Sequence, residues 1–282
     1  MRNILIAGGD MRQICCSRRL SAKYETSVIG FDGDMLPDDM SCGTGKEKYG
    51  YAVLPVLPLD DNGDISTPCF SGSISAEQIK SLLAPDAVIF AGRANERLHE
   101  MFRGHDILDY MEREELSLRN AVPTAEGAVQ IALEELPVTL SGLKVLIAGM
   151  GRIGTALSVI LKGFGADVTA AVRNTRGAAK AALIGVEPVY MNDVPSGFGL
   201  VFNTVPSMIF GREELSRFGR DTLFIDLASK PGGIDMKAAQ EMGMKVIWAL
   251  GLPGKTAPVT AGEIIADTIG NMISEREDDH VR

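Results

Sequence analysis

The chain alternates short, continuous apolar runs with stretches whose polarity suits helices. The run 4–7 ends in Gly8-Gly9-Asp10, and the run 145–148 ends in Gly149-Met150-Gly151. A second apolar run follows each glycine turn, so Gly8 and Asp32 are 24 positions apart, as are Gly149 and Arg173. Continuous apolar strands that alternate with helices are typical of parallel sheets covered on both faces. The repeat predicts an α/β fold of two Rossmann-like, doubly wound parallel-sheet domains in tandem, with a cleft between them.

The same pattern predicts the individual elements. The expected strands, besides the two runs above, are 27–31, 87–91, 167–172, 200–203, 223–227 and 245–249. The expected helices are 153–162, 178–183, 211–218, 236–241 and a final one from residue 261 that returns to the first domain. Residues 33–74 are rich in Gly, Pro, Asp and Ser, which predicts loop with short extended pieces.

The length of 282 residues exceeds the roughly 100–200 residues of a single domain. We predict one domain over residues 1–122 together with the C-terminal helix 261–282, and a second over 123–260. Residues 123–136 have helical periodicity, and Thr124 can cap their first turn, which predicts an interdomain helix there.

The second repeat carries a glycine fingerprint, Gly149-Met150-Gly151-Arg152-Ile153-Gly154. In this spacing Gly149 permits a tight turn, Gly151 lets the backbone approach a pyrophosphate, and Gly154 allows a helix to pack close to a strand. The N-terminus of the following helix offers N–H donors and a positive dipole to the phosphates. The strand and helix pattern around the fingerprint predicts a dinucleotide site in the second domain.

The residues after the next strand indicate which dinucleotide binds. Sites for NAD place an acid there for the ribose 2′-OH, whereas this chain has Arg173-Asn174-Thr175-Arg176. Arginine forms bidentate, charge-assisted hydrogen bonds to a phosphate. The prediction is therefore NADP, with Arg173 as the main contact; the alternative is that both arginines are ordinary surface residues.

The first repeat differs in chemistry. Asp32 stands where an NAD-type acid is expected, but Asp10 puts a negative side chain in the place of the second glycine. We interpret the first domain as a degenerate copy that serves the substrate or a partner.

Three Pro/Gly-framed loops follow strands of the second domain, where ligands bind in doubly wound sheets. They begin at Asn203, Asp226 and Leu250. Together with the fingerprint, they give the predicted cofactor-binding set: Gly149, Gly151, Arg152, Ile153, Gly154, Arg173, Asn174, Thr175, Arg176, Thr204, Val205, Pro206, Leu227, Ala228 and Ser229.

Composition narrows the class of partner. Lys+Arg number 28 and Asp+Glu 37, a net charge of −9, which argues against binding to nucleic acid or an anionic membrane. The apolar run near the start is too short for a signal peptide or a membrane span. The four cysteines fit no zinc spacing, and reduced thiols in a cytoplasmic protein are expected.

An ordered set of motifs points to a known family. It comprises Gly8-Gly9-Asp10-Met11-Arg12-Gln13, Pro123-Thr124-Ala125-Glu126-Gly127, the glycine fingerprint, Asp226–Gly233 and Gly251–Pro258. From about residue 3 to residue 270 the chain resembles the A subunit of dipicolinate synthase and, more distantly, D-isomer 2-hydroxyacid and alanine dehydrogenases. The resemblance implies NADP⁺-dependent oxidation of dihydrodipicolinate, or of its hydrated precursor, to dipicolinate on a branch of the lysine pathway. It also implies that the partner is a flavoprotein-like B subunit and that the location is the mother cell of a sporulating bacterium; a homo-oligomer is expected.

Aromatisation of the substrate makes positioning the main task of the protein. The candidates to bind the substrate dicarboxylate are Arg12, Arg93 and Lys255, and the candidate bases are Glu126, Lys255, Asp226 and Asp10. The three histidines lie outside the motifs, which argues against an ordinary hydroxyacid dehydrogenase. Two alternatives stay open: an NADP-linked dehydrogenase of another amino or hydroxy acid, and a nucleotide-binding scaffold whose partner carries the chemistry.

Overall fold

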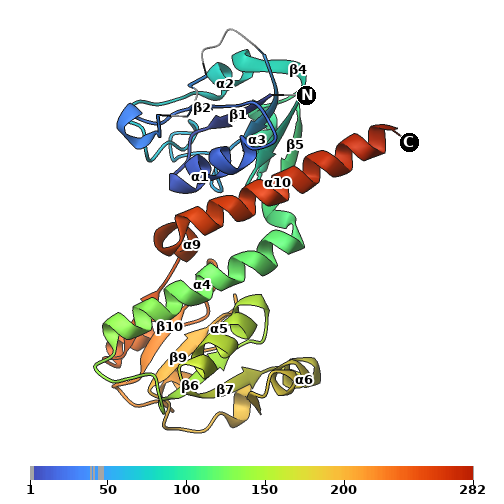
Figure 1. Cartoon of the computed structure of the whole chain (residues 1–282). Helices are drawn as coiled ribbons and strands as arrows, with labels where there is room; N and C mark the ends of the chain where they lie inside the picture. Colours follow the sequence, from blue (N-terminus) through green and yellow to red (C-terminus); the bar gives the residue numbers. More distant parts are fainter. Residues whose placement is uncertain (1–2, 39, 41, 44–47, 282) are drawn as a thin grey trace. The chain divides into compact units, whose positions relative to one another are not determined.

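The computed structural model describes residues 3–38, 40, 42–43 and 48–281, with side chains as far as residue 278 (Figure 1). The chain divides into two compact units, called unit 1 and unit 2 below. Unit 1 comprises Met1–Asn120 and Ala257–Arg282, and unit 2 comprises Ala121–Thr256. The boundary at residue 120 falls within helix α4 (Glu114–Glu135).

Unit 1 is built on a five-stranded parallel sheet. The strand order is β2-β1-β3-β4-β5, which is the flavodoxin-like order, and β1 pairs with both β2 and β3. The strands are β1 (Ile4–Ala7), β2 (Thr26–Ile29), β3 (Tyr49–Val53), β4 (Leu83–Ala91) and β5 (Asp106–Asp109). The helices are α1 (Met11–Leu20), α2 (Ala76–Leu82), α3 (Glu96–Met101), the first part of α4, and α10 (Pro258–Val281), with short 3-10 turns at Gly33–Met35 and Tyr110–Glu112.

Alternate residues of β1 separate the two faces of this sheet. Ile4 and Ile6 belong to a core that includes α1 and four isoleucines of α10, whereas Leu5 and Ala7 belong to a core with α2 and α3. Helix α10 therefore completes the sheet face on which α1 lies. Gly262 permits the close contact, because a Cβ there would lie 2.4 Å from the backbone oxygen of Arg12.

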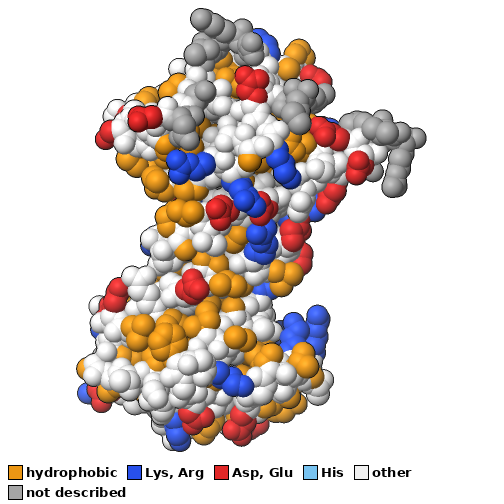
Figure 2. Space-filling view, viewed as in Figure 1, with side chains coloured by type: hydrophobic (Ala, Val, Ile, Leu, Met, Phe, Trp, Pro, Cys, Tyr) orange, Lys and Arg blue, Asp and Glu red, His pale blue; other side chains and the backbone are white. Residues whose placement is uncertain are grey.

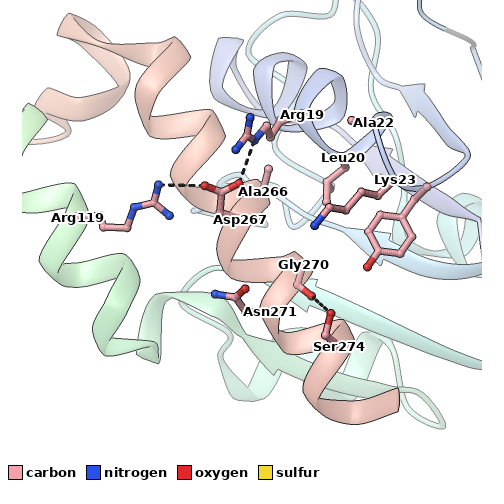
Figure 3. Close-up of a pocket in the computed structure, with 11 residues that line it drawn as sticks. Arg19, Leu20, Ala22, Lys23, Arg119, Ala266, Asp267, Gly270, Asn271 and Ser274 are labelled. Atoms are coloured by element: carbon pink, nitrogen blue, oxygen red, sulfur yellow. Dashed lines mark hydrogen bonds and ion pairs between the residues drawn. The ribbon is translucent and has the colours of Figure 1, made fainter. Parts of the chain in front are cut away.

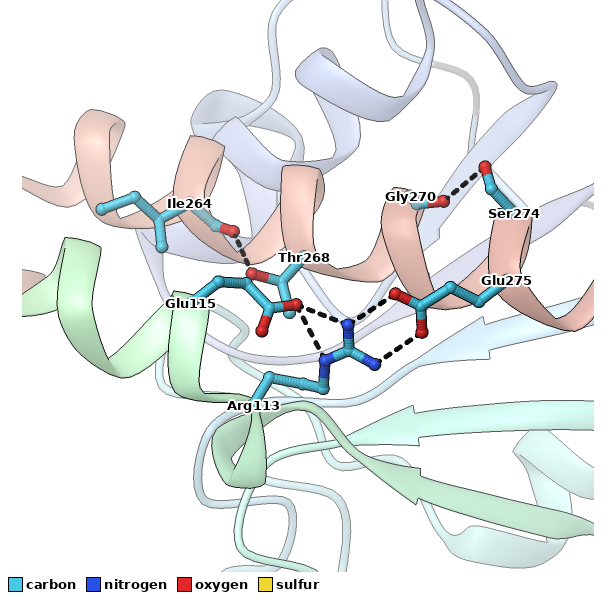
Figure 4. A network of polar contacts seen from close by, with 7 residues as sticks. All are labelled: Arg113, Glu115, Ile264, Thr268, Gly270, Ser274 and Glu275. Carbon is cyan, nitrogen blue, oxygen red and sulfur yellow. Dashed lines mark hydrogen bonds and ion pairs between the residues drawn. The ribbon is translucent and has the colours of Figure 1, made fainter.

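An ion-pair network also holds α10 to the start of α4 (Figure 4). The two terminal nitrogens of the Arg113 guanidinium each lie 2.7 Å from a carboxylate oxygen of Glu275, and Nε donates to Glu115 at 2.8 Å. Hydrogen bonds from the Arg113 guanidinium, together with its positive charge, lower the pKa of both Glu275 and Glu115, and these effects outweigh the opposing desolvation. The C-terminal helix is thus an integral part of unit 1.

Unit 2 is built on a six-stranded parallel sheet in the order β11-β10-β9-β6-β7-β8. Numbered within the unit, this is the Rossmann order, with its switch point between β6 and β9. The strands are β6 (Lys144–Ala148), β7 (Asp167–Val172), β8 (Glu187–Tyr190), β9 (Leu200–Asn203), β10 (Leu223–Asp226) and β11 (Lys245–Trp248). The helices are the rest of α4, α5 (Arg152–Gly163), α6 (Thr175–Leu183), α7 (Arg212–Leu215), α8 (Met236–Glu241) and α9 (Leu252–Thr256), with a 3-10 turn at Met191–Asp193.

The two faces of this sheet are covered in the same manner. Val145 and Ile147 pack in a core with α4, α5 and α6, and Leu146 and Ala148 pack in a core with α7 and α8. The second core contains three aromatic rings, Phe210, Phe218 and Phe224, in edge-to-face contacts with centroids 5.1–6.0 Å apart. Two parallel-sheet α/β domains of Rossmann type, as predicted, are confirmed.

Several predicted boundaries were wrong. No helix begins at Pro123 with Thr124 as its cap: α4 already begins at Glu114 and runs through both residues. An internal proline removes one backbone hydrogen bond, and the apolar packing of α4 outweighs that loss. The final helix begins at Pro258 rather than residue 261, with a proline in its first turn, which helices tolerate. It continues to Val281.

Other elements were missed. Strand β3 lies at the centre of the first sheet, although it falls in the stretch 33–74 that reads mainly as loop. The edge strands β5 and β8 and the short helix α9 within the predicted loop 250–258 were also not predicted. Edge strands and single helical turns are too short for periodicity to reveal them.

Candidate functional site

The glycine turn of unit 2 lies at the switch point of its sheet, between the carboxyl ends of β6 and β9. Gly149 has φ +94°, and a Cβ there would lie 2.6 Å from Oγ1 of Thr204. A Cβ on Gly154 would lie 2.0 Å from the backbone oxygen of Gly149. Both positions therefore require glycine for the turn itself, as the fingerprint predicts.

Gly151 is different, because a Cβ there would meet no atom of the described residues within 4 Å. It is the N-cap residue of α5, has no side chain to satisfy the first N–H groups of the helix, and adopts an extended conformation that other residues also reach. The space in front of it and the N–H groups at the start of the helix form a cradle into which a diphosphate fits. The geometry thus suits a dinucleotide.

The loop after β9 closes the other side of this turn. Oγ1 of Thr204 donates to the backbone oxygen of Ala148 at 2.8 Å, and its N–H donates to the same oxygen at 3.0 Å. Val205 also approaches Gly149, with Cγ2 2.9 Å from a Cβ placed there. The structure therefore brings Thr204 and Val205 together with the fingerprint.

A buried polar pair fixes the loops after β9 and β10. Asn203 is fully buried and Asp226 is 1% exposed, and Nδ2 of Asn203 donates to Oδ1 of Asp226 at 2.7 Å. Asp226 also accepts from the N–H groups of Ala228, at 3.0 Å, and Gly233, at 2.8 Å. With three donors on a buried carboxylate, Asp226 serves as a structural acceptor rather than a base. The sequence offered it as a candidate base and gave no sign of its pairing with Asn203.

The predicted phosphate-binding residues follow β7. Arg173, Asn174, Thr175 and Arg176 are all exposed, and Asn174 is the N-cap of α6, where its side chain accepts from the N–H of Gly177 at 3.0 Å. Within the described residues, neither Arg173 nor Arg176 forms an ion pair. Their guanidinium groups are thus available to an anion at the carboxyl end of β7.

Glu126 and Lys255 lie on adjoining helices of unit 2. A Cβ on Gly127 would lie 2.9 Å from Oγ1 of Thr256, so α4 and α9 touch there. Glu126 and Lys255 immediately precede these two contact residues, and both are exposed. The structure therefore brings these two candidates into one region at the level of their helices.

In unit 1, another loop of the same unit occupies the space beside the corresponding glycine turn. Gly8 and Gly9 have φ +69° and +100°, and the N–H of Gly9 donates to the backbone oxygen of Ser66 at 2.8 Å. A Cβ on Gly8 would lie 2.7 Å from that oxygen. Asp32, in the position of an NAD-type acid, accepts from Oγ of Ser71 at 2.9 Å and from its N–H. The loop containing Ser66 and Ser71 therefore occupies the space that a dinucleotide needs, which agrees with a degenerate copy.

Arg12 and Asp10 form a close ion pair at the start of α1. Nη2 of Arg12 lies 2.7 Å from Oδ2 of Asp10, its Nε donates to Oδ1 at 2.9 Å, and Asp10 is the N-cap of the helix. Partial burial raises the pKa of Asp10, but the hydrogen bonds and charge of Arg12 outweigh it and hold that pKa below its ordinary value. The guanidinium of Arg12 stays partly exposed, and its remaining N–H groups can reach a ligand.

Two further features of unit 1 stand out. Arg93, at the carboxyl end of β4, has φ +47° and is exposed; among the described residues it alone adopts a left-handed conformation without being glycine. Gln13 is fully buried, and no described residue forms a hydrogen bond with either polar atom of its side-chain amide. In the sequence, Gln13 stood out only as part of the motif Gly8–Gln13, because a sequence pattern does not show that an amide is buried without a hydrogen-bond partner.

The described residues contain no group of three potential metal ligands, and all four cysteines are free thiols. Nowhere in the described chain is a helix both long and apolar enough to cross a membrane. His99 is exposed on α3, and Nδ1 of His105 lies 3.2 Å from the backbone oxygen of Ala87, at the amino side of the sheet. The side chain of His280 lies outside the described residues.

Each unit of the chain matches a known protein family. Residues 3–111 match the family model for the N-terminal domain of the A subunit of dipicolinate synthase. Residues 123–241 match the model of the D-isomer specific 2-hydroxyacid dehydrogenase, NAD binding domain. The A subunit of dipicolinate synthase from Bacillus subtilis (strain 168) is 29% identical over 284 residues, which cover 96% of each chain.

Solved structures agree. The A chain of dipicolinate synthase from Bacillus subtilis has a TM-score of 0.87 at 28% identity and covers 99% of this chain and 97% of its own. The corresponding protein from Bacillus halodurans has a TM-score of 0.85 at 29% identity, with coverage of 96% and 97%. These findings support an oxidoreductase role with a nicotinamide cofactor, since unit 2 carries a dehydrogenase-type nucleotide domain. The resemblance to the A subunit of dipicolinate synthase that the motifs predict is thus confirmed along nearly the whole chain.

Proposed function

We propose that the chain is an NADP-dependent dehydrogenase that oxidises dihydrodipicolinate, or its hydrated precursor, to dipicolinate. The preference for NADP rests on one observation: Arg173 and Arg176 are exposed at the carboxyl end of β7, and residues 173–176 include no carboxylate. The substrate part rests on the similarity to the A subunit of dipicolinate synthase. By the same similarity we propose that the partner is a B subunit, that the location is the cytoplasm of the mother cell of a sporulating bacterium, and that the chain assembles into a homo-oligomer.

Unit 2 supplies the groups that would hold the cofactor. The N–H groups at the start of α5 and the open space at Gly151 receive the diphosphate, and Arg173, with Asn174, Thr175 and Arg176 around it, receives the 2′-phosphate. The loops with Thr204, Val205 and Pro206 and with Leu227, Ala228 and Ser229 flank the nicotinamide. When bound, the nicotinamide ring supplies the hydride acceptor.

The substrate dianion requires cationic partners because the chain as a whole is acidic. Within unit 1, we assign Arg12 and Arg93 to the substrate carboxylates. The unpaired amide of Gln13 supports this role for the first turn of α1, because a polar ligand would satisfy a group that otherwise costs stability. The backbone strain at Arg93 is also typical of functional positions.

Loss of a proton accompanies oxidation of the ring. Glu126 is our proposed base, with Lys255 on the adjoining helix, and both are exposed enough to exchange protons with water. Asp226 and Asp10 are not assigned this role, because the first accepts three hydrogen bonds and the second is neutralised by Arg12.

An absorbance assay of NADPH formation tests the proposal. The whole chain, alone and with the B subunit, is mixed with NADP⁺ and freshly generated dihydrodipicolinate, and NAD⁺ is the comparison cofactor. We expect NADPH to form, and faster than NADH. Turnover only with another amino or hydroxy acid would favour the first alternative, and NADPH binding without turnover in the presence of the partner would favour a scaffold.

A further inference from the structure

A cavity of about 480 Å³ lies on unit 1 between α1, the start of α4 and α10 (Figure 3). It is far along α1 from the glycine turn, because α1 begins at the carboxyl edge of the sheet and ends at the opposite edge, before β2. Residues from the end of α1, including Arg19, and from the middle of α10, including Asp267, line it. The cavity is therefore separate from the residues assigned to the substrate.

Three cations border this cavity, against one carboxylate in its wall. Nε of Arg19 donates to Oδ1 of Asp267 at 3.0 Å, and Nη2 of Arg119 donates to Oδ2 at 3.0 Å. Partial burial raises the pKa of Asp267, but these hydrogen bonds and the two positive charges outweigh it and lower that pKa overall. The carboxylate thus stays ionised and holds one guanidinium on each side.

Most N–H donors of the Arg19 and Arg119 guanidinium groups have no acceptor among the described residues. Each arginine has five N–H donors, and the contacts with Asp267 use one from each. Lys23 has no ion pair within the described chain, and Figure 3 shows its side chain pointing from the turn after α1 toward α10. In Figure 2, blue and red side chains gather over α1 and α10 on this face.

These charges favour an anion despite the acidity of the whole chain. Donors that are already fixed in place lose little freedom when a ligand binds, and guanidinium groups match the planar geometry of a carboxylate. Arg19 and Arg119, held in place by Asp267 on one wall, and Lys23 on another wall can bind two acidic groups of one ligand at the same time. The volume lies within the range of small-molecule sites.

We propose that this cavity binds a small molecule with two carboxylates, as a second site distinct from the proposed catalytic one. One carboxylate meets Arg19 and Arg119, and the other meets Lys23. Because the cations are partly exposed, binding weakens as salt concentration rises.

Calorimetric titration of the whole chain tests this site, with pyridine-2,6-dicarboxylate as the probe and inorganic phosphate and acetate in parallel titrations. We expect the dicarboxylate to bind more tightly than either. Lys23→Gln should weaken it roughly three- to tenfold.

Matched control variants on α3 and in the turn after it distinguish the effect of a charge at the cavity from the effect of the overall charge of the chain. Arg103→Gln removes one positive charge and Glu100→Gln one negative charge, and both are exposed residues of unit 1 that should leave the affinity within about twofold. Equal effects of Lys23→Gln and Arg103→Gln would overturn the proposal, as would tighter binding of phosphate. The probe is also the product in the proposed function and can bind at the proposed catalytic site, so the second site is judged from the difference between Lys23→Gln and Arg103→Gln, which does not depend on turnover.

Discussion

Arg173 is an exposed residue whose chemistry, rather than its packing, determines its importance in our proposal. Replacement by Asp puts a negative charge where the 2′-phosphate of NADP would bind. We expect NADP affinity to fall roughly 10- to 100-fold, the effect of losing a charge-assisted hydrogen bond and adding repulsion, while NAD affinity changes little. Fluorescence titration with both cofactors measures this, and Lys180→Gln, near the other end of α6, is the control. Equal losses for both cofactors would remove Arg173 from the site.

The ion pair of Asp10 and Arg12 predicts a specific pH dependence. Asn caps a helix about as well as Asp, so Asp10→Asn isolates the ion pair. We expect a loss of about 1 kcal/mol in the free energy of unfolding near neutral pH, since both side chains are partly exposed.

The sign of this effect follows from the lowered pKa of Asp10. The stabilisation is complete above the unfolded pKa of about 3.9 and is lost as pH falls through the lower pKa of the folded state. Urea titrations at a series of pH values should show the two proteins converging on the acid side. A difference that persists at the lowest pH would mean that Asn distorts the turn.

Gln13 offers a test of whether the first turn of α1 receives substrate. Gln13→Leu replaces a buried, unpaired amide with an apolar side chain of similar size, so we expect the free energy of unfolding to rise by roughly 1–3 kcal/mol. If the amide binds substrate, KM should rise while NADP affinity stays unchanged. Greater stability with an unaltered KM would show that the amide has no part in substrate binding.

At the scale of elements, the turn between β6 and α5 contains glycines with two different roles, one for binding the cofactor and one for packing. In Gly151→Ala the new methyl group meets no atom within 4 Å in the part of the chain that the structure describes, so stability should be unchanged. Cofactor affinity should fall at least tenfold, because the methyl group enters the space proposed for the diphosphate. In Gly154→Ala the methyl group would collide with the backbone oxygen of Gly149, and we expect a loss of roughly 1–3 kcal/mol. Thermal unfolding and cofactor titration of both variants distinguish these outcomes. Equal destabilisation by both would contradict the assigned roles.

The sequence predicted elements well where a signal was long or repeated. Strands such as β6 and β9 are continuous apolar runs, and the glycine fingerprint located the turn at the switch point. Strand β3 was hidden, because its tyrosines and glycine do not form a continuous apolar run. The start of α4 was misplaced because Pro123 resembles a helix start. The pairing of Asn203 with Asp226 needs neighbouring strands to bring distant residues together, and no local pattern encodes that.

At the scale of the whole molecule, unit 1 is discontinuous and unit 2 is continuous in sequence. We expect residues 121–256 to fold when expressed alone and residues 1–120 alone to fail. The reason is that Ile264, Ile265, Ile269 and Ile273 of α10 lie in the core of unit 1, each at most 4% exposed. Losing four buried isoleucines at about 2–5 kcal/mol each exceeds the stability of an ordinary domain.

Circular dichroism and cooperative urea unfolding of the two fragments check this expectation. Residues 1–120 mixed with a peptide of residues 257–282 form the control, which should recover a cooperative transition. A stable 1–120 fragment would show that α10 is an accessory of unit 1 and not part of its core.

The return of α10 to unit 1 also has a consequence during synthesis. The ribosome releases the N-terminal strands first, yet the helix that covers one side of their sheet emerges only after the whole of unit 2. Domains that are contiguous in sequence can fold as soon as they leave the exit tunnel. Unit 2 can therefore fold during synthesis while the sheet of unit 1 still exposes the apolar face that α10 later covers.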